Sequence, residues 1–257
     1  MKFRMVIVCL LVVVFCLVGC GKKERIEGVV QDAFGNPLKD VSVKIEKTTF
    51  TSITDGSGKY SIDYAPGAIK LIFSKENYTT INLELSIQQK SYFPAELIVL
   101  YPIPKEKGLF YIDKEKKQLV KLESNCIVDE VSTSNPGFSL TMHYRHFVKF
   151  QKPAMTIKPG KTEFIDNIPY GINIFAIKDD GLIYEGDLNM FERHDKSTGF
   201  IKDSESKKGT EGLLVREIDL SAGSYAWIEM LNTQTIGAIP KKGGAAIGFV
   251  VAAQKVK

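Results

Sequence analysis

Two histidines come closest to a metal site by residue type and spacing. His143 and His146 stand three positions apart in "MHYRH", and neutral imidazole is a common ligand of zinc. That spacing aligns two side chains on a helix, but on a strand it places them on opposite faces. The surrounding residues alternate as in a strand, and His194 could join either histidine only through the fold. The sequence therefore predicts no metal centre and no cofactor.

The acidic turn "DGSGKY", which begins at Asp55, is a second candidate for cation binding. Asp55 and Ser57 offer oxygen atoms, but the fifth position is Lys59, and no bidentate glutamate closes the loop as an EF-hand requires. We expect Asp55 to accept hydrogen bonds from the backbone of its own turn instead.

No nucleophile stands in a catalytic motif. The pattern G-x-S-x-G is absent, and its nearest approach, "GFSLT" at Gly137 to Thr141, lacks the second glycine. Cys126 has no histidine near it in the sequence, so we expect a buried small hydrophobic residue rather than a reactive thiol. "KKGGAAIG", from Lys241 to Gly248, has its glycines after its lysines, which favours a hairpin turn over a phosphate loop. A serine–histidine pair or a carboxylate pair assembled by the fold remains open.

Aromatic residues are the best candidates for ligand binding. Tyr225 and Trp227 are two positions apart, so on a strand they share one face. With Tyr144, they could form a platform on which sugar rings stack. The alternative, which we favour, is that the single tryptophan packs in a core.

The N-terminus carries an export signal. Lys2 and Arg4 precede an apolar run that ends at Val18, and a helix of that run spans about 21 Å against about 30 Å of bilayer hydrocarbon. The run ends in "LVGC", which resembles the lipobox of bacterial lipoproteins. The resemblance implies cleavage before Cys20 and acylation of its thiol. Two or three acyl chains hold a protein on a membrane almost permanently.

The expected address follows from this resemblance. We expect residues 1–19 to be a lipoprotein signal peptide and 20–25 a lipidated tether, with the membrane bound through Cys20. Gly21 and Lys22 follow the cysteine, and neither is the aspartate that retains some lipoproteins on an inner membrane. The sequence favours the outer membrane or cell surface.

Charge and cysteine content exclude some partners and linkages. The chain has 34 basic and 30 acidic residues, and loss of the signal peptide would remove two of the basic ones. No dense run of lysine or arginine with interleaved aromatics occurs, so no nucleic-acid partner is expected. Of the four cysteines only Cys126 lies beyond the lipobox, so no disulfide within the mature chain is expected.

Residues 26–102 show the pattern of short β-strands. Apolar and polar residues alternate in "VSVKIEK" and "INLELSI", and the turns "FGNP", "DGSG" and "PG" separate the strands. The spacing predicts an antiparallel β-sandwich. The last run, "AELIVLYP", is apolar on both faces and is expected to be a central or well-covered strand.

This segment resembles the carboxypeptidase regulatory-like family, which has a transthyretin-like β-sandwich. The resemblance lies in "IEGVVQDAFGNPLKDVSVKIE" and "TSITDGSGKYSIDYAPGAIKLIFSKENYTT". It implies a non-catalytic accessory module and no particular substrate. No H-x-x-E zinc-peptidase motif is present, because none of the three histidines has a glutamate three positions later.

Residues 103–257 are expected to form a second, β-rich and sandwich-like domain of a type we do not recognise. Eight segments carry the strand signal: "GLFYI", "QLVKL", "FSLTMHYRHFVKF", "INIFAI", "GLIYEG", "LLVREIDL", "SYAWIEML" and "AAIGFVVAA". The polar, glycine-containing segment from His194 to Gly212 is expected to be a long exposed loop.

Two functions remain after these exclusions. The absence of a catalytic motif favours an all-β envelope lipoprotein that binds or scaffolds without catalysis, with a polysaccharide, peptidoglycan or a protein as its partner. The alternative is an envelope hydrolase of glycans or peptides whose active site lies in the C-terminal domain. A third hypothesis, a carrier of an apolar ligand, requires an internal apolar pocket.

Overall fold

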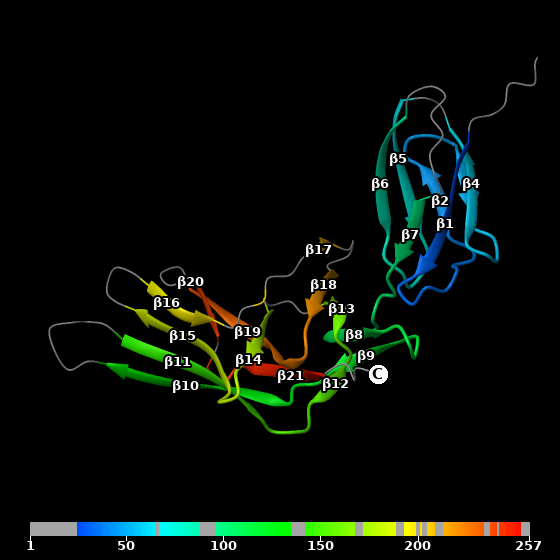
Figure 1. Cartoon of the computed structure of the whole chain (residues 1–257). Coiled ribbons are helices and arrows are strands. Elements are labelled where there is room, and N and C mark those ends of the chain that lie inside the picture. The colour runs from blue at the N-terminus through cyan, green and yellow to red at the C-terminus, as the bar shows by residue number, and fades with distance from the viewer. Residues whose placement is uncertain are drawn as a thin grey trace, which may run out of the picture. The chain divides into compact units, whose positions relative to one another are not determined.

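The computed structural model shows an all-β protein (Figure 1). It describes residues 25–64, 67–87, 96–134, 142–167, 172–188, 193–198, 201, 205–208, 213–233, 237–240 and 242–252. Cys20 lies outside these residues. Within them, no helix has the length and apolar character needed to cross a membrane. The chain divides into two compact units, the first reaching Leu100 and the second starting at Tyr101, except that residues 33–35 and 77–79 belong to the second.

The first unit consists of two small sheets. One sheet has the order β4 (Lys59–Asp63), β1 (Arg25–Asp32) and β7 (Glu96–Leu100); the other has the order β3 (Thr51–Ile53), β2 (Ser42–Ile45), β5 (Gly67–Ser74) and β6 (Ile81–Ile87). The predicted alternation is confirmed in β2 and just before it, since Val41, Val43 and Ile45 are all buried. Period 2 located β2 and β6, the apolar run "AELIVLYP" located β7, and the remaining strands were expected from the family resemblance.

Strand β7 corrects two expectations about the first unit. It lies at an edge of its sheet rather than at the centre, and Leu97 is 54% exposed while Ile98 and Leu100 are buried. It also pairs with β1 in parallel, so the sandwich is not purely antiparallel. An apolar run on both faces does not distinguish a central strand from an edge strand whose outer residues remain partly exposed.

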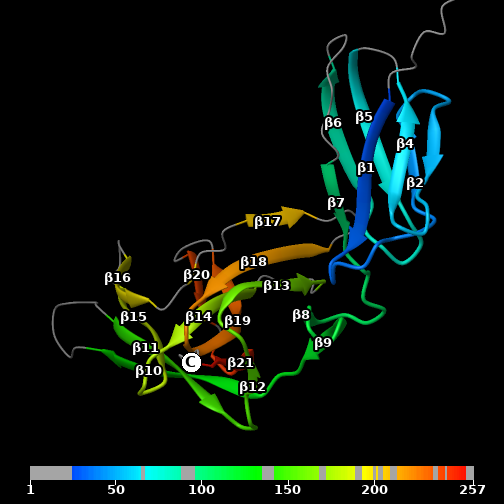
Figure 2. The same cartoon turned by 45° about the vertical axis from the view of Figure 1, so that its right-hand side comes forward.

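Two larger sheets make up the second unit. The nine-stranded sheet has the order β14 (Ile172–Ile177), β19 (Gly223–Thr233), β21 (Ala245–Val251), β10 (Cys126–Ser134), β11 (Met142–Phe150), β15 (Leu182–Leu188) and β16 (Arg193–Thr198), with β12 (Met155–Ile157) on β21 and β20 (Gly237–Pro240) on β19. The five-stranded sheet has the order β17 (Glu205–Lys208), β18 (Leu214–Leu220), β13 (Gly160–Asp166), β8 (Leu109–Asp113) and β9 (Gln118–Leu122). In Figure 2, β17, β18 and β13 run side by side.

Within the nine-stranded sheet, strands β14, β19 and β21 have a hydrophobic core on each face, and we call these three strands the middle layer. One face, which includes Tyr225, Trp227 and Phe249, packs with the five-stranded sheet. The other face, which includes Ala226 and Ala246, packs with β10, β11 and β15. Burial on both faces explains the apolar runs in these strands, such as "YAWI" in β19 and "AAIGFVV" in β21.

Six strands of the second unit, β10, β12, β13, β16, β17 and β20, have no counterpart among the eight predicted segments. The stretch from 194 to 212, expected to be a loop, contributes most of β16 and all of β17, which are the outermost strands of the two large sheets. Edge strands gain backbone pairing without an apolar pattern, which is why periodicity missed them. The expected turn at Lys242 and Gly243 is confirmed, but it joins β20 to β21, which pair with different parts of β19 and not with each other.

Close packing between β21 and its neighbours depends on Gly248. A Cβ atom at this position would lie 2.3 Å from Cε1 of Phe150 and 2.5 Å from Sγ of Cys126. The backbone of Gly248 is also fixed, because its N–H donates to Oδ1 of Asn125 at 2.7 Å and its carbonyl accepts from Nδ2 of the same side chain at 2.9 Å. The strand therefore cannot move away to make room.

We predict that Gly248→Ala lowers the free energy of unfolding of the second unit by about 1–3 kcal/mol, the usual cost of overpacking a core. Fluorescence of Trp227, the single tryptophan, during urea unfolding measures it. Cys126→Ala removes the closest sulfur, so the double variant should lose less than the sum of the two single losses. Additive losses would show that Sγ of Cys126 takes no part in the clash.

Candidate functional site

The structure does not bring the three predicted aromatic residues together. Tyr225 and Trp227 share one face of β19 and are buried in the core toward the five-stranded sheet. Tyr144 is buried in the other core, where its ring stacks on Tyr184 with centroids 5.7 Å apart. These positions agree with the favoured interpretation that the tryptophan packs in a core. A ligand-binding role for the three residues stays a prediction.

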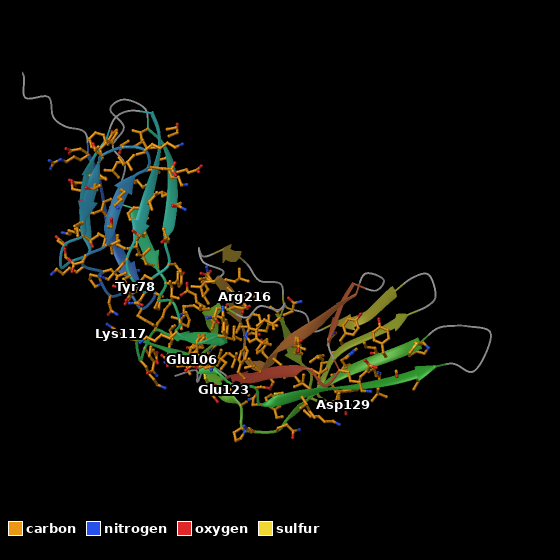
Figure 3. The ribbon with its side chains drawn as sticks, turned by 180° about the vertical axis from the view of Figure 1, so that it is seen from behind. Tyr78, Glu106, Lys117, Glu123, Asp129 and Arg216 are labelled. Carbon is orange, nitrogen blue, oxygen red and sulfur yellow. The ribbon has the colours of Figure 1, made fainter. Side chains whose placement is uncertain are left out.

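Trp227 takes part in the tightest contacts of this core. Its ring meets that of Phe164 edge to face at 5.3 Å, and the guanidinium of Arg216 lies 5.1 Å from its centroid. Arg216 in turn pairs with Asp166 at 3.2 Å, and both side chains are largely buried. Figure 3 shows Arg216 among the densely packed side chains of the second unit. A buried ion pair against an aromatic ring is a structural element here rather than an open site.

The two neighbouring histidines lie on opposite faces of β11, as the strand pattern predicted. His146 is fully buried, and its Nε2 lies 3.1 Å from Oε2 of Glu130 on the adjacent strand. The side chain of His194 is outside the description. Among the residues whose side chains are described, no group of three or more histidine, cysteine, aspartate or glutamate side chains is placed to hold a metal ion.

Cys126 and Asp55 have the structural roles expected from the sequence. Burial raises the pKa of the Cys126 thiol to about 11, which leaves it protonated at neutral pH. Asp55 accepts hydrogen bonds from the Ser57 hydroxyl and from the backbone N–H groups of Ser57 and Lys59. These bonds lower the pKa of the Asp55 carboxyl, the Ser57 hydroxyl having the largest effect.

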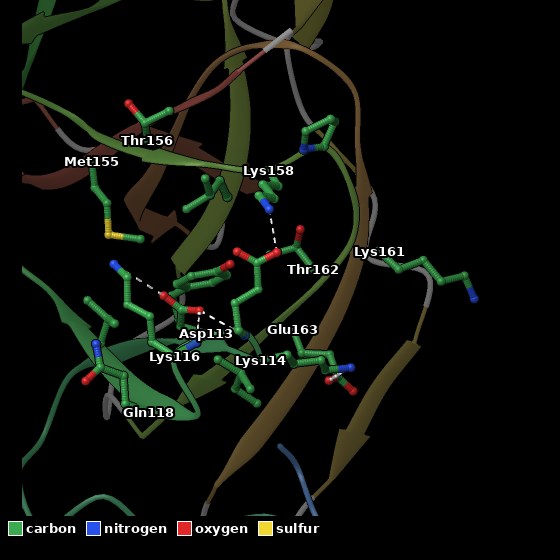
Figure 4. A pocket seen from close by; sticks show the side chains of 16 residues that line it. Asp113, Lys114, Lys116, Gln118, Met155, Thr156, Lys158, Lys161, Thr162 and Glu163 are labelled. Atoms are coloured by element: carbon green, nitrogen blue, oxygen red, sulfur yellow. Dashed lines mark hydrogen bonds and ion pairs between the residues drawn. The ribbon is translucent and has the colours of Figure 1, made fainter. Parts of the chain in front are cut away.

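A groove in the second unit, which we call the hairpin groove, is a further candidate site. It has a volume of about 360 Å³ and is formed by the β8–β9 hairpin together with β12 and the start of β13 (Figure 4). Tyr111 and Val120 are cross-strand partners, as are Asp113 and Gln118, so these four side chains share one face of the hairpin. Tyr111 and Met155 also pack against the core of the middle layer. The apolar part of the groove is therefore the margin of that core.

Charged side chains surround this apolar part. Lys114 pairs with Glu163 at 2.7 Å, Lys116 pairs with Asp113 at 3.7 Å, and Lys158 pairs with Glu115. The three pairs are drawn in Figure 4, where Lys161 points away from them. Lys161 instead pairs with Glu217, at 3.1 Å. The groove thus combines an apolar floor with ammonium and carboxylate groups.

Burial and the nearby carboxylates raise the pKa of two tyrosine hydroxyl groups near the groove. Burial raises the pKa of Tyr111, and the charges of Asp113 and Glu115 raise it further. Burial also raises the pKa of Tyr101, whose hydroxyl donates to Oε1 of Glu163 at 2.9 Å. Both phenols are hydrogen-bond donors at neutral pH.

Sequence reasoning missed the hairpin groove because its two halves are distant in the chain. The signals are the charge-rich hairpin "YIDKEKKQLV" and the proline–glycine turn in "TIKPGKTE". Taken alone, each of these two segments predicts only an exposed turn. The pairing of β13 with β8, in which Phe164 lies opposite Tyr111, brings them together.

Comparison with known proteins identifies part of the first unit. Residues 25–96 match the family described as the carboxypeptidase regulatory-like domain, which confirms that part of the prediction. No curated protein matches the chain.

Similarity to solved structures is distant. A chain of a type II cohesin–X-dockerin complex from Acetivibrio cellulolyticus is 20% identical, with a TM-score of 0.24, over 30% of this chain and 57% of that one. A candidate carbohydrate binding protein from Bacteroides uniformis is 11% identical, with a TM-score of 0.22, over 90% of this chain and 100% of that one. The TIE protein of Bacillus anthracis is 11% identical, with a TM-score of 0.24, over 89% of this chain and 48% of that one. At these scores the similarities assign no function to this chain.

We predict that the Cys126 thiol of the native protein does not react with iodoacetamide at pH 8, because the thiol is buried and its pKa is about 11. Unfolding in urea should expose it to complete alkylation. Mass spectrometry of the peptide that contains Cys126 measures both states separately from the other cysteines. Rapid alkylation of the native protein would show an accessible, reactive thiol.

Proposed function

We propose that this protein is a lipid-anchored binding protein of the bacterial envelope and that its hairpin groove binds a glycan. The carboxypeptidase regulatory-like domain of the first unit acts as a non-catalytic accessory module, and the second unit contains the binding site. The observation that carries the proposal is the composition of the groove, in which the aromatic ring of Tyr111 and the side chains of Val120 and Met155 are surrounded by charged groups.

The chemistry of sugars fits this combination. A pyranose ring has C–H groups on its faces, which pack on aromatic and aliphatic side chains, and hydroxyl groups on its edges, which exchange hydrogen bonds with charged groups. The volume of about 360 Å³ is near the lower end of the range for small-ligand sites, so it suits one or two sugar units of a longer chain. The β8–β9 and β12–β13 turns line the groove, and turns lie at the surface of a protein.

A lipid anchor supports a role at the envelope. The proposed acylation of Cys20 would hold the binding unit at a membrane surface, where glycan polymers are concentrated. The anchor rests on the lipobox resemblance in "LVGC" together with the charged and apolar segments before it.

We predict that Tyr111→Ala reduces glycan affinity by up to about tenfold, because stacking on an aromatic ring contributes on the order of 0.5–1.5 kcal/mol. Tyr111→Phe, the matched control, keeps the ring and should retain most of the affinity. Isothermal titration of the mature protein with neutral and uronic-acid hexasaccharides measures this, with circular dichroism as a check on folding. Equal binding by the wild type and Tyr111→Ala would remove the groove as the site. Release of shorter saccharides during the titration would favour the hydrolase hypothesis instead.

We predict that Cys20→Ser moves the protein from the membrane fraction to the soluble fraction of expressing cells, since the acylated thiol would be its anchor. Mass spectrometry of the wild-type N-terminal peptide should find Cys20 as the first residue, with a diacylglyceryl group. An intact, unmodified leader peptide on the purified wild-type protein would contradict the proposed location.

A further inference from the structure

We propose that the hairpin groove selects acidic glycans, in which a carboxylate or phosphate of the ligand binds Lys158 in place of Glu115. This inference rests on the proposed function, because it names the class of glycan for the same groove. The inference comes from a difference in exposure between the members of the ion pairs: two of the three acids are largely buried, whereas all three lysines are exposed.

Two of the three acids in the groove are already engaged by the protein. The Glu163 side chain is only 10% exposed, and its two oxygens are taken by the Tyr101 hydroxyl and by Lys114. The Asp113 side chain is 13% exposed, and its Oδ1 accepts the backbone N–H groups of Glu115 and Lys116. These carboxylates have little capacity left for the hydroxyl groups of a ligand.

The lysines of the three ion pairs, in contrast, are exposed to solvent. The side chains of Lys114, Lys116 and Lys158 are 58%, 72% and 72% exposed, although each is in an ion pair. An ammonium group has three donors, so each can bind a further acceptor while it keeps its present partner. The solvent-facing part of the groove is therefore rich in positively charged donors, which favours an anionic ligand.

Glu115 is the acid that a ligand can displace. Its side chain is 68% exposed, and its partner Lys158 is equally accessible. An ion pair between two exposed side chains contributes little to stability, so breaking it costs little. Lys158 comes from the β12–β13 turn and Glu115 from the β8–β9 hairpin, so the pair links the two segments that line the groove. A ligand anion at Lys158 would lie in the same groove as Tyr111 and Met155.

The pair Lys149–Asp129 provides a matched control. It is also an exposed lysine–carboxylate pair, with its atoms 2.6 Å apart and side chains 60% and 40% exposed, and neither residue lines the groove. Figure 3 shows Asp129 well away from Lys117 of the β8–β9 hairpin. Substitution of Lys149 removes the same charge from the protein without touching the proposed site.

The test compares an oligogalacturonate with its fully methyl-esterified, neutral form of the same length, by isothermal titration of the mature protein at two salt concentrations. We expect the acidic form to bind about tenfold more tightly at low salt and to lose this advantage at high salt. Lys158→Gln should weaken binding of the acidic form about tenfold, while Lys149→Gln should change it less than twofold. Glu115→Gln should strengthen binding severalfold, because it removes the competing carboxylate. A phosphorylated oligomannoside, run alongside, shows whether phosphate is also accepted.

The other possible results would overturn one or both of the two proposals. Equal affinity for the acidic and neutral forms would overturn the selection of acidic glycans and leave the proposed glycan site intact. Binding of neither form, nor of the phosphorylated oligomannoside or the neutral hexasaccharides, would overturn both proposals. Equal losses with Lys158→Gln and Lys149→Gln would show attraction by net charge alone and overturn the role of Lys158. Weaker binding by Glu115→Gln would show that Glu115 contacts the glycan instead of competing with it.

Discussion

The second unit depends on one packing constraint, which is that β14, β19 and β21 must be covered on both faces. Their side chains divide by size: Tyr225, Trp227 and Phe249 face the five-stranded sheet, whereas Ala226 and Ala246 face β10, β11 and β15. Small residues and Gly248 allow the second of these layers to come close, because a single added carbon would meet Phe150 and Cys126. The bulky face requires a thicker layer, and the aromatic rings with the Arg216–Asp166 pair fill it.

The proposed binding site follows from the same arrangement. Tyr111 and Met155 belong to the margin of the aromatic core, where the two sheets end, so their apolar surface is only partly covered. The turns that extend past this margin carry the charges, since turns face water and accept lysine and glutamate readily. Lys117 and Gly160 both have positive φ angles, of 53° and 109°, which set the path of these two turns. An amphipathic groove is thus a direct result of where the core stops.

Local pattern was sufficient to predict the fold class and part of the strands, because period 2 and turn residues are local properties. It also predicted that Cys126 would be buried and that Asp55 would bond its own turn. Pairing partners are not local, so the edge position of β7 was missed. Strands β10, β12, β13, β16, β17 and β20 were not predicted either. The groove was missed for the same reason, since Asp113 and Lys158 are neighbours only through the fold. The aromatic residues singled out from the sequence lie in two cores because the middle layer has two buried faces.

The central claim is that the second unit binds glycan at the β8–β9 and β12–β13 turns. Amide chemical-shift mapping of the isotope-labelled mature protein, titrated with an oligogalacturonate, tests it most directly. The account predicts that the largest shift changes fall in residues 111–118 and 155–163, with the carboxypeptidase regulatory-like domain unaffected. Shift changes confined to residues 25–100, or none at millimolar concentrations of either the oligogalacturonate or the neutral hexasaccharide, would contradict it.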